Sequence, residues 1–225
     1  MLKDLRTKSI VLRRTNFGES DRILNLLTEN GYQSVIAKGV RKEKSKLAGG
    51  IEMFCLSEIT IHAGKNNKLG ILTSAKMLKA YNKIIIDLEK LELASTVLKQ
   101  INKVAENSTK NEYFDLLNQT LAGINDTKDL KLIESWFLLN YAKTNGDEIN
   151  LHRDVTGAKL DPYKTYIWDT NENCLREQIG GNIGANAIKL MRLMVSSKFD
   201  IISRVKDVEV IIPSILHIAK AINKI

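Results

Sequence analysis

The sequence is poor in several residues and patterns, and each shortage excludes a class of protein. With only Cys55 and Cys174 among 225 residues, a disulfide-stapled scaffold is excluded and the reducing cytoplasm is the expected location. No stretch approaches the roughly 18 consecutive apolar residues of a membrane span. The charged first residues, MLKDLRTKS, lack the apolar run of a signal peptide. Aromatic residues make up only 6% of the chain, which leaves few side chains for stacking on a ligand.

Positive charge is abundant but unevenly distributed. The formal net charge is +8, and residues 1–50 carry 11 Lys and Arg against 5 Asp and Glu. A basic surface of this kind attracts nucleic acid or an acidic membrane. Because this part of the chain contains no basic amphipathic helix, nucleic acid is the favoured partner and no membrane association is expected.

The most informative stretch is SVIAKGVRKEKSKLAGG, residues 34–50. Residues 34–37 are small or β-branched and predict a strand, and Gly49-Gly50 closes the stretch with a flexible backbone. Between them lies a segment, residues 38–46, that we call the basic loop. Its cations are opposed only by Glu43, and they are Lys38, Arg41, Lys42, Lys44 and Lys46. A strand that leads into a basic, glycine-bounded loop is typical of polyanion binding, although many such charge runs are merely solvated loops.

The basic loop also has some likeness to a phosphate-binding loop of nucleotide triphosphatases. Counting back from Lys44-Ser45, however, Lys38 and Glu43 stand at the two positions that require glycine. Without those glycines the backbone cannot wrap a triphosphate, so this function is excluded.

Residues 1–80 predict a β domain. Apolar alternation and turn residues such as Asn30-Gly31 indicate five short strands. They are expected at residues 7–14, 22–28, 32–38, 56–63 and 69–73. Five short strands rich in turns favour a small barrel of the oligonucleotide-binding (OB) type.

Residues 81–225 predict a mainly helical domain, so the fold class is α+β. Helix N-caps are expected at Asp87, Asn111 and Asp126, and the third helix, residues 130–143, is apolar on more than one face and stops at Asn145-Gly146. Residues 147–183 form an irregular β and turn insertion with one short strand at 165–168. Further helices are expected at 185–196 and from Pro213 onward.

Two stretches of the β domain resemble the RecO family of bacterial recombination mediators. They are SIVLRRTNFGESDRILNLLT (residues 9–28) and VIAKGVRKEKSKLAGG (residues 35–50). The combination of FGE-x-DRI at 17–23 with AKG-x-RK-x-KSKL at 37–47 is specific. The likeness is strong over residues 1–60 and weak after residue 147.

The resemblance implies a function without covalent chemistry. Members of the family bind single- and double-stranded DNA and anneal complementary strands. With the partner RecR they help RecA load onto DNA coated by single-strand binding protein, and they bind the acidic, apolar tail of that protein. Many members also carry a four-cysteine zinc site in the region that matches 147–183. Here only Cys174 lies there, and His152 and His217 do not complete a set with the usual spacing, so no zinc is expected.

The candidate DNA contacts are cations of the first 50 residues. Arg grips phosphate with two parallel hydrogen bonds and Lys acts as a point charge, so such binding is largely independent of sequence. The candidates are Arg13, Arg14, Arg22, Lys38, Arg41, Lys42, Lys44 and Lys46. Arg13 and Arg14 point to opposite faces of a regular strand, so one of them is expected to face DNA, and Arg22 could instead pair with an acid. Phe17 is the candidate for base stacking.

The helical region holds candidates for the partner-tail groove, chosen by chemistry alone. They are Lys131, Trp136, Phe137 and Lys143, although the two aromatics are better explained as core residues. Two rival functions stay open. One is a general single-stranded DNA or RNA-binding OB protein with no mediator role. The other is a metal-dependent nuclease using Asp154, Asp161 and His152.

Overall fold

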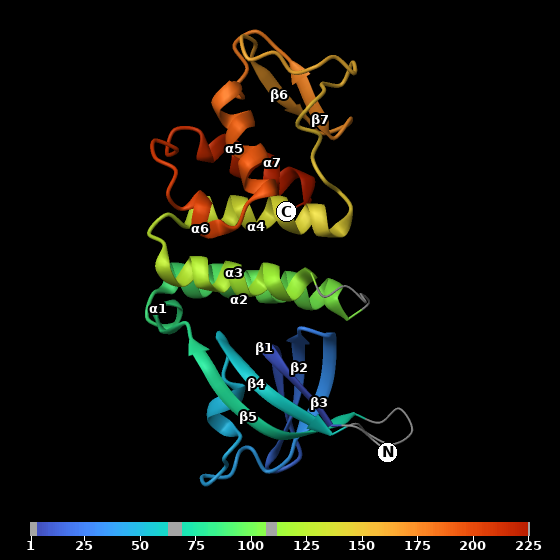
Figure 1. Cartoon of the computed structure of the whole chain (residues 1–225), viewed down its shortest axis with the longest axis vertical. Coiled ribbons are helices and arrows are strands. Elements are labelled where there is room, and N and C mark those ends of the chain that lie inside the picture. The colour runs from blue at the N-terminus through green and yellow to red at the C-terminus, as the bar shows by residue number, and fades with distance from the viewer. Residues whose placement is uncertain (1–3, 63–68, 107–111, 225) are drawn as a thin grey trace. The chain divides into compact units, whose positions relative to one another are not determined.

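The computed structural model describes residues 4–62, 69–106 and 112–224 (Figure 1). The chain forms two compact units, Met1–Asp126 and Thr127–Ile225. Neither unit has, within these ranges, a helix with the length and apolar character needed to cross a bilayer.

The five predicted strands form a closed barrel in the first unit. They are β1 (Asp4–Phe17), β2 (Asp21–Thr28), β3 (Gly31–Ala37), β4 (Cys55–His62) and β5 (Gly70–Ala80). The strands follow the order β1-β2-β3-β5-β4, and β4 pairs with β1 to close the barrel. All pairings are antiparallel except β3 with β5, which is parallel at Val35–Gly70 and Ile36–Ile71. The end of the predicted fourth strand, Ala63, lies outside the described residues.

Alternating side chains build the barrel core. Ile59 and Ile61 point inward and are buried, as their spacing predicts, together with Val11, Leu24 and other apolar residues of all five strands. Strand β5 continues seven residues past its predicted end at 73. Residues 74–80 are mostly exposed and show no alternation, so only the pairing with β4 makes them a strand.

Helices cover one outer face of the barrel. They are α1 (Asn82–Ile85), α2 (Leu88–Ala105) and α3 (Glu112–Asp126), and α2 and α3 lie side by side (Figure 1). Ile10 and Leu27 alternate with core residues of β1 and β2, and are completely buried on this face. Asp87 caps α2 as predicted, accepting a hydrogen bond from the Lys90 backbone N–H at 3.2 Å. The barrel thus ends at residue 80, but the compact unit continues to Asp126 because α2 and α3 pack on the barrel. The predicted cap Asn111 lies outside the described residues.

The second unit is organised around α4 (Leu130–Asn145). Its N-cap is Asp129, whose carboxylate accepts the Leu132 N–H at 3.0 Å; the predicted cap Asp126 is wrong because that residue is still the last of α3. Gly146 ends the helix in the left-handed conformation, as predicted. The helix packs against α5 (Ala185–Ser196) and α7 (Ile212–Ile222), both close to their predicted positions, and α6 (Phe199–Ile202) follows α5.

The segment 147–183 is more ordered than its sequence indicates. The expected short strand is β6 (Tyr166–Asp169), and it pairs with an unpredicted strand, β7 (Cys174–Glu177), in an antiparallel hairpin. The Asp154 carboxylate holds the preceding turn by accepting from the backbone of Thr156, the Thr156 hydroxyl and the backbone of Ala158, at 2.6–3.1 Å. These donors hold the pKa of Asp154 below its ordinary value, with the Thr156 hydroxyl as the largest cause.

Candidate nucleic-acid interface

The basic loop is attached to the barrel through its apolar residues. Val40 and Ile51 are buried in the barrel core, and Leu47 packs against it. Ile51 belongs to a short 3-10 helix, η1 (Ala48–Ile51), that follows the loop. The five cations all point outward and are exposed: Lys38, Arg41, Lys42, Lys44 and Lys46. The sequence pattern therefore corresponds to a basic surface with an apolar anchor.

The basic loop is fastened to the turn between β1 and β2. The Asp21 carboxylate accepts a hydrogen bond from the Gly39 backbone N–H at 2.7 Å. The Arg41 backbone N–H donates to the Ser20 carbonyl at 2.9 Å, and its guanidinium donates to the Gly18 carbonyl at 3.3 Å. Gly18 and Gly39 have φ angles of 55° and 62°, a backbone conformation that residues with side chains rarely adopt, so glycine is needed at both bends. Loop and turn therefore form one surface.

The charges on this surface are largely unneutralised. In the parts of the chain that the structure describes, the side chains of the four lysines have no hydrogen-bond or ion-pair partner: Lys38, Lys42, Lys44 and Lys46. Glu43 is exposed on the same loop and is its only acid. Four ammonium groups without partners can bind phosphates without first breaking an ion pair.

Phe17 stands next to the turn at the end of β1. Its side chain is 52% exposed, an unusual position for an aromatic ring. Of the other aromatics of the barrel region, Phe54 is buried and Tyr32 is half-buried. Phe17 is therefore exposed where Phe54 and Tyr32 are not, and its stacking on a base stays a prediction.

The three strand arginines have different surroundings. Arg22 pairs across the sheet with Ala37, next to Lys38, and its Nε donates to the Asn16 side chain at 3.2 Å. Arg14 forms an ion pair with Glu52 at 2.7 Å and is mostly buried, so it has a structural role. Arg13 is exposed and has no hydrogen-bond or ion-pair partner among the described residues.

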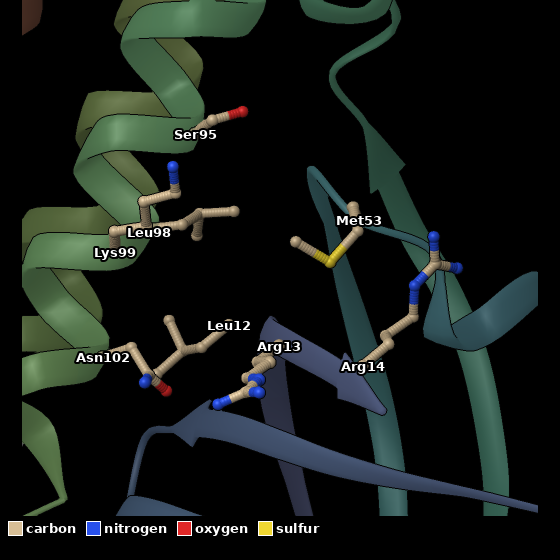
Figure 2. Close-up of a pocket in the computed structure, with 8 residues that line it drawn as sticks. All are labelled: Leu12, Arg13, Arg14, Met53, Ser95, Leu98, Lys99 and Asn102. Atoms are coloured by element: carbon tan, nitrogen blue, oxygen red, sulfur yellow. The ribbon is translucent and has the colours of Figure 1, made fainter. Parts of the chain in front are cut away.

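Strand β1 is irregular just before the two arginines, between Val11 and Arg13. The bulge exchanges the two faces of the strand beyond it. Arg13 lies opposite Asn25, which bonds to Asn102 of α2 on the outer side, and Arg14 lies opposite the core residue Leu24, so the two arginines point to opposite faces, as predicted. Both arginines also line a cavity against α2, with their side chains pointing in different directions (Figure 2). The pKa of the half-buried Tyr32 phenol is raised, mainly by burial and further by the negative charge of Glu106. The positive charge of Arg13 lowers this pKa in part.

The two aromatic candidates for the partner-tail groove, Trp136 and Phe137, are core residues, which is the interpretation that the sequence favours. Trp136 is 3% exposed and Phe137 1% exposed, because α4 is central to the second unit. The Trp136 indole donates to the Ser197 carbonyl at 2.9 Å, and Phe137 stacks on Tyr141. The two lysines remain at the surface: Lys131 is exposed, and Lys143 pairs with Glu148 at 3.3 Å and donates to the Val195 carbonyl.

The acidic residues of the 147–183 segment are occupied by turns. Asp154 is buried and accepts three hydrogen bonds, and the Asp161 carboxylate accepts the Tyr163 backbone N–H at 2.8 Å. The Cys174 thiol donates to the Arg153 carbonyl. Within the described ranges, no three His, Cys, Asp or Glu side chains gather closely enough to hold a metal ion.

Sequence reasoning missed three residues of this region. Asp21 fastens the basic loop through its hydrogen bond from the Gly39 N–H. In the sequence, this role is indicated only by the position of Asp21 directly after the turn, at the end of FGESD. Lys99 and Met53 line the cavity beside Arg13 and Arg14, and they come from segments far apart in the chain. No local pattern could have joined them.

Comparisons with known proteins agree with this architecture. The family model "Recombination protein O N terminal" matches residues 1–81, and "Recombination protein O C terminal" matches residues 86–212. A protein named DNA repair protein RecO from Dehalococcoides mccartyi is 30% identical over 212 residues, which cover 90% of this chain and 83% of the relative. Another of that name, from Halalkalibacterium halodurans, is 27% identical over 195 residues, or 84% and 76% of the two chains. The chain therefore belongs to the RecO family of DNA repair and recombination proteins.

Proposed function

We propose that this chain is a recombination mediator that binds single- and double-stranded DNA without sequence specificity. It anneals complementary strands and helps RecA load onto DNA coated by single-strand binding protein. It acts by binding alone, without covalent chemistry and without zinc. Its place of action is the bacterial cytoplasm, on the nucleoid.

The basic loop carries this proposal. Five exposed cations, four of them lysines without a partner among the described residues, are held against a turn that presents Phe17. The strand order and the parallel β3–β5 pairing support assignment of the barrel to the OB type, in which the loop between the first two strands is part of the nucleic-acid surface.

Phosphate contacts explain why binding would ignore sequence. Lysine and arginine contacts to the backbone carry no base information. An annealing protein must accept any pair of complementary strands, and it brings them together by neutralising their mutual repulsion. The basic loop supplies that neutralisation, and Phe17 adds a sequence-tolerant stacking contact.

The proposed partners are RecR, RecA and the tail of single-strand binding protein, as expected for a member of this family. No groove for the tail is assigned, because Trp136 and Phe137 are buried. In place of a zinc site, the Asp154 turn and the β6–β7 hairpin hold the segment 147–183.

Strand annealing tests the proposal against the plain single-stranded DNA or RNA binder. Two complementary fluorescent oligonucleotides are mixed with the protein, first bare and then coated with single-strand binding protein. A mediator accelerates annealing in both cases. A protein that binds the strands but does not accelerate annealing is the plain binder, and the mediator function would be rejected.

A further inference from the structure

A cavity of about 560 Å³ lies between β1 and α2, within the first compact unit (Figure 2). Its size falls in the range of small-molecule sites. The residues that line it come from β1, from the segment after η1 and from one face of α2: Leu12, Arg13, Arg14, Met53, Ser95, Leu98, Lys99 and Asn102. Nothing in the function proposed so far uses this cavity.

Three apolar side chains, Leu12, Met53 and Leu98, form the inner part of the cavity wall. Val11 points into the barrel core, whereas Leu12, which has no register partner at the bulge, is buried on the outer side beside α2. Figure 2 shows Leu98 and Met53 pointing toward each other across the space. The thioether of methionine adapts its shape to flat or irregular ligands. The interior is thus suited to the face of a planar, largely apolar group.

The mouth of the cavity is polar and positively charged. Arg13 and Lys99 are exposed and have no hydrogen-bond or ion-pair partner within the described ranges, and no carboxylate lines the cavity. Arg14 is already neutralised by Glu52. The Asn102 amide accepts a hydrogen bond from Asn25, the cross-strand neighbour of Arg13, at 3.5 Å. A ligand with a flat body, polar edges and an anionic group fits these features.

The cavity is continuous along the chain with the basic loop. Arg14 lies roughly 10 Å from Phe17 along the same strand, since a strand rises about 3.3 Å per residue. Met53 follows η1, the short helix that comes after the basic loop. Strand β1 therefore carries both Phe17, beside the basic loop, and Arg13, at the cavity mouth.

We propose that the cavity receives an unpaired base of a DNA single strand, with the neighbouring phosphates on Arg13 and Lys99. This proposal rests on the DNA-binding function proposed above and adds a means of telling single strands from duplexes. Bases in a duplex are paired and stacked, so entering the cavity would require breaking those contacts. A guanidinium also stacks well on a base, which suits Arg13 at the mouth.

Two variants test the cavity without touching the basic loop. The Ser95 side chain points into the space (Figure 2), so Ser95→Phe fills it, and Lys99→Gln removes one charge at its mouth. The control is Lys103→Gln, an exposed lysine one turn farther along α2 that does not line the cavity. Affinities for oligothymidylate and for a blunt DNA duplex are measured for each protein, and thermal melting checks that it is folded.

The proposal predicts that Ser95→Phe loses about fivefold or more in affinity for oligothymidylate, the smallest loss expected for one base contact, and that Lys99→Gln, which removes one phosphate contact, also binds it more weakly. Their affinity for the duplex and both affinities of the control stay at the wild-type value. If the wild type binds DNA and the folded variants keep its single-strand to duplex ratio, the cavity proposal is overturned while the DNA-binding function stands. If the wild type binds neither DNA, the function itself fails. If only binding of an acidic, phenylalanine-containing peptide is lost, the cavity is a protein-docking site and the proposal is wrong.

Discussion

Neutralising the basic loop should change the salt dependence of DNA binding by a calculable amount. The variant replaces its four lysines by glutamine: Lys38, Lys42, Lys44 and Lys46. Arg41 is left intact because its guanidinium helps to fasten the loop to the Gly18 carbonyl. All four lysine side chains are exposed and make no hydrogen bond or ion pair with any described residue, so the fold should not change.

Each phosphate neutralised on a single strand contributes about 0.7 to the slope of log affinity against log salt concentration. If each of the four lysines neutralises one phosphate, the slope of the variant is shallower by about 2.8. Between about 50 and about 200 mM salt, the advantage of the wild type over the variant should then shrink about 50-fold. Fluorescence anisotropy of a labelled oligonucleotide over a salt series gives both slopes.

A second variant removes the same charge elsewhere. It replaces four exposed lysines of the second unit by glutamine: Lys128, Lys189, Lys198 and Lys206. This control should keep the wild-type slope, because the counterions are released where phosphates bind and not by net charge alone. A loop variant with the slope of the wild type, or a control with the slope of the loop variant, would refute the assignment of the interface to the basic loop.

Two further predictions concern the elements that hold the fold. Asp154→Asn should lower the free energy of unfolding at neutral pH by about 1–3 kcal/mol, because the hydrogen bonds from Thr156 and Ala158 then reach a neutral acceptor. Because the pKa of Asp154 is depressed in the folded protein, its contribution to stability is present above the unfolded pKa of about 3.9 and is lost as the pH falls through the folded pKa. In urea titrations, the unfolding free energies of wild type and variant should therefore converge below about pH 4. A difference in unfolding free energy that does not vary with pH would contradict the ionised Asp154 carboxylate as its source. Gly50→Ala should lower unfolding stability by about 1–3 kcal/mol, since its Cβ would come within 2.6 Å of Ala75, whereas Gly49→Ala, with nothing within 4 Å, should be nearly neutral; equal melting temperatures for the two variants would rule out this close packing of η1 on β5.

The parts of the fold that sequence predicts well are those with a strong local signal. Alternation in β4, with Ile59 and Ile61 inward, and the cap at Asp87 were both readable because each depends on residues a few positions apart. Residues 74–80 of β5 lack such a signal, since their strand conformation comes from pairing with β4. The cap of α4 was misplaced because Asp126 and Asp129 are both suitable residues, and only packing decides where α3 ends.

In the candidate site, too, local features could be predicted from the sequence and tertiary contacts could not. The cations of the basic loop could be found from composition, because exposed charge needs no tertiary partner to be recognised. The hydrogen bond from Gly39 to Asp21 could not, since it joins two loops 18 residues apart. Trp136 looked suited to a partner groove by chemistry, but burial is decided by the helices around α4. The bulge at Leu12 similarly exchanged the faces of the residues that follow it, and no pattern predicts the cavity that Arg13 and Arg14 line with α2.

The most direct test of the account is the rate of strand annealing by three proteins: the wild type, the loop variant and the control variant with four lysines replaced in the second unit. Complementary oligonucleotides carrying a donor and an acceptor dye report duplex formation, at protein concentrations that saturate the wild type. The account predicts that the wild type and the control accelerate annealing equally and that the loop variant does not. Undiminished annealing by a folded loop variant would contradict the claim that the basic loop is the DNA interface through which this protein acts.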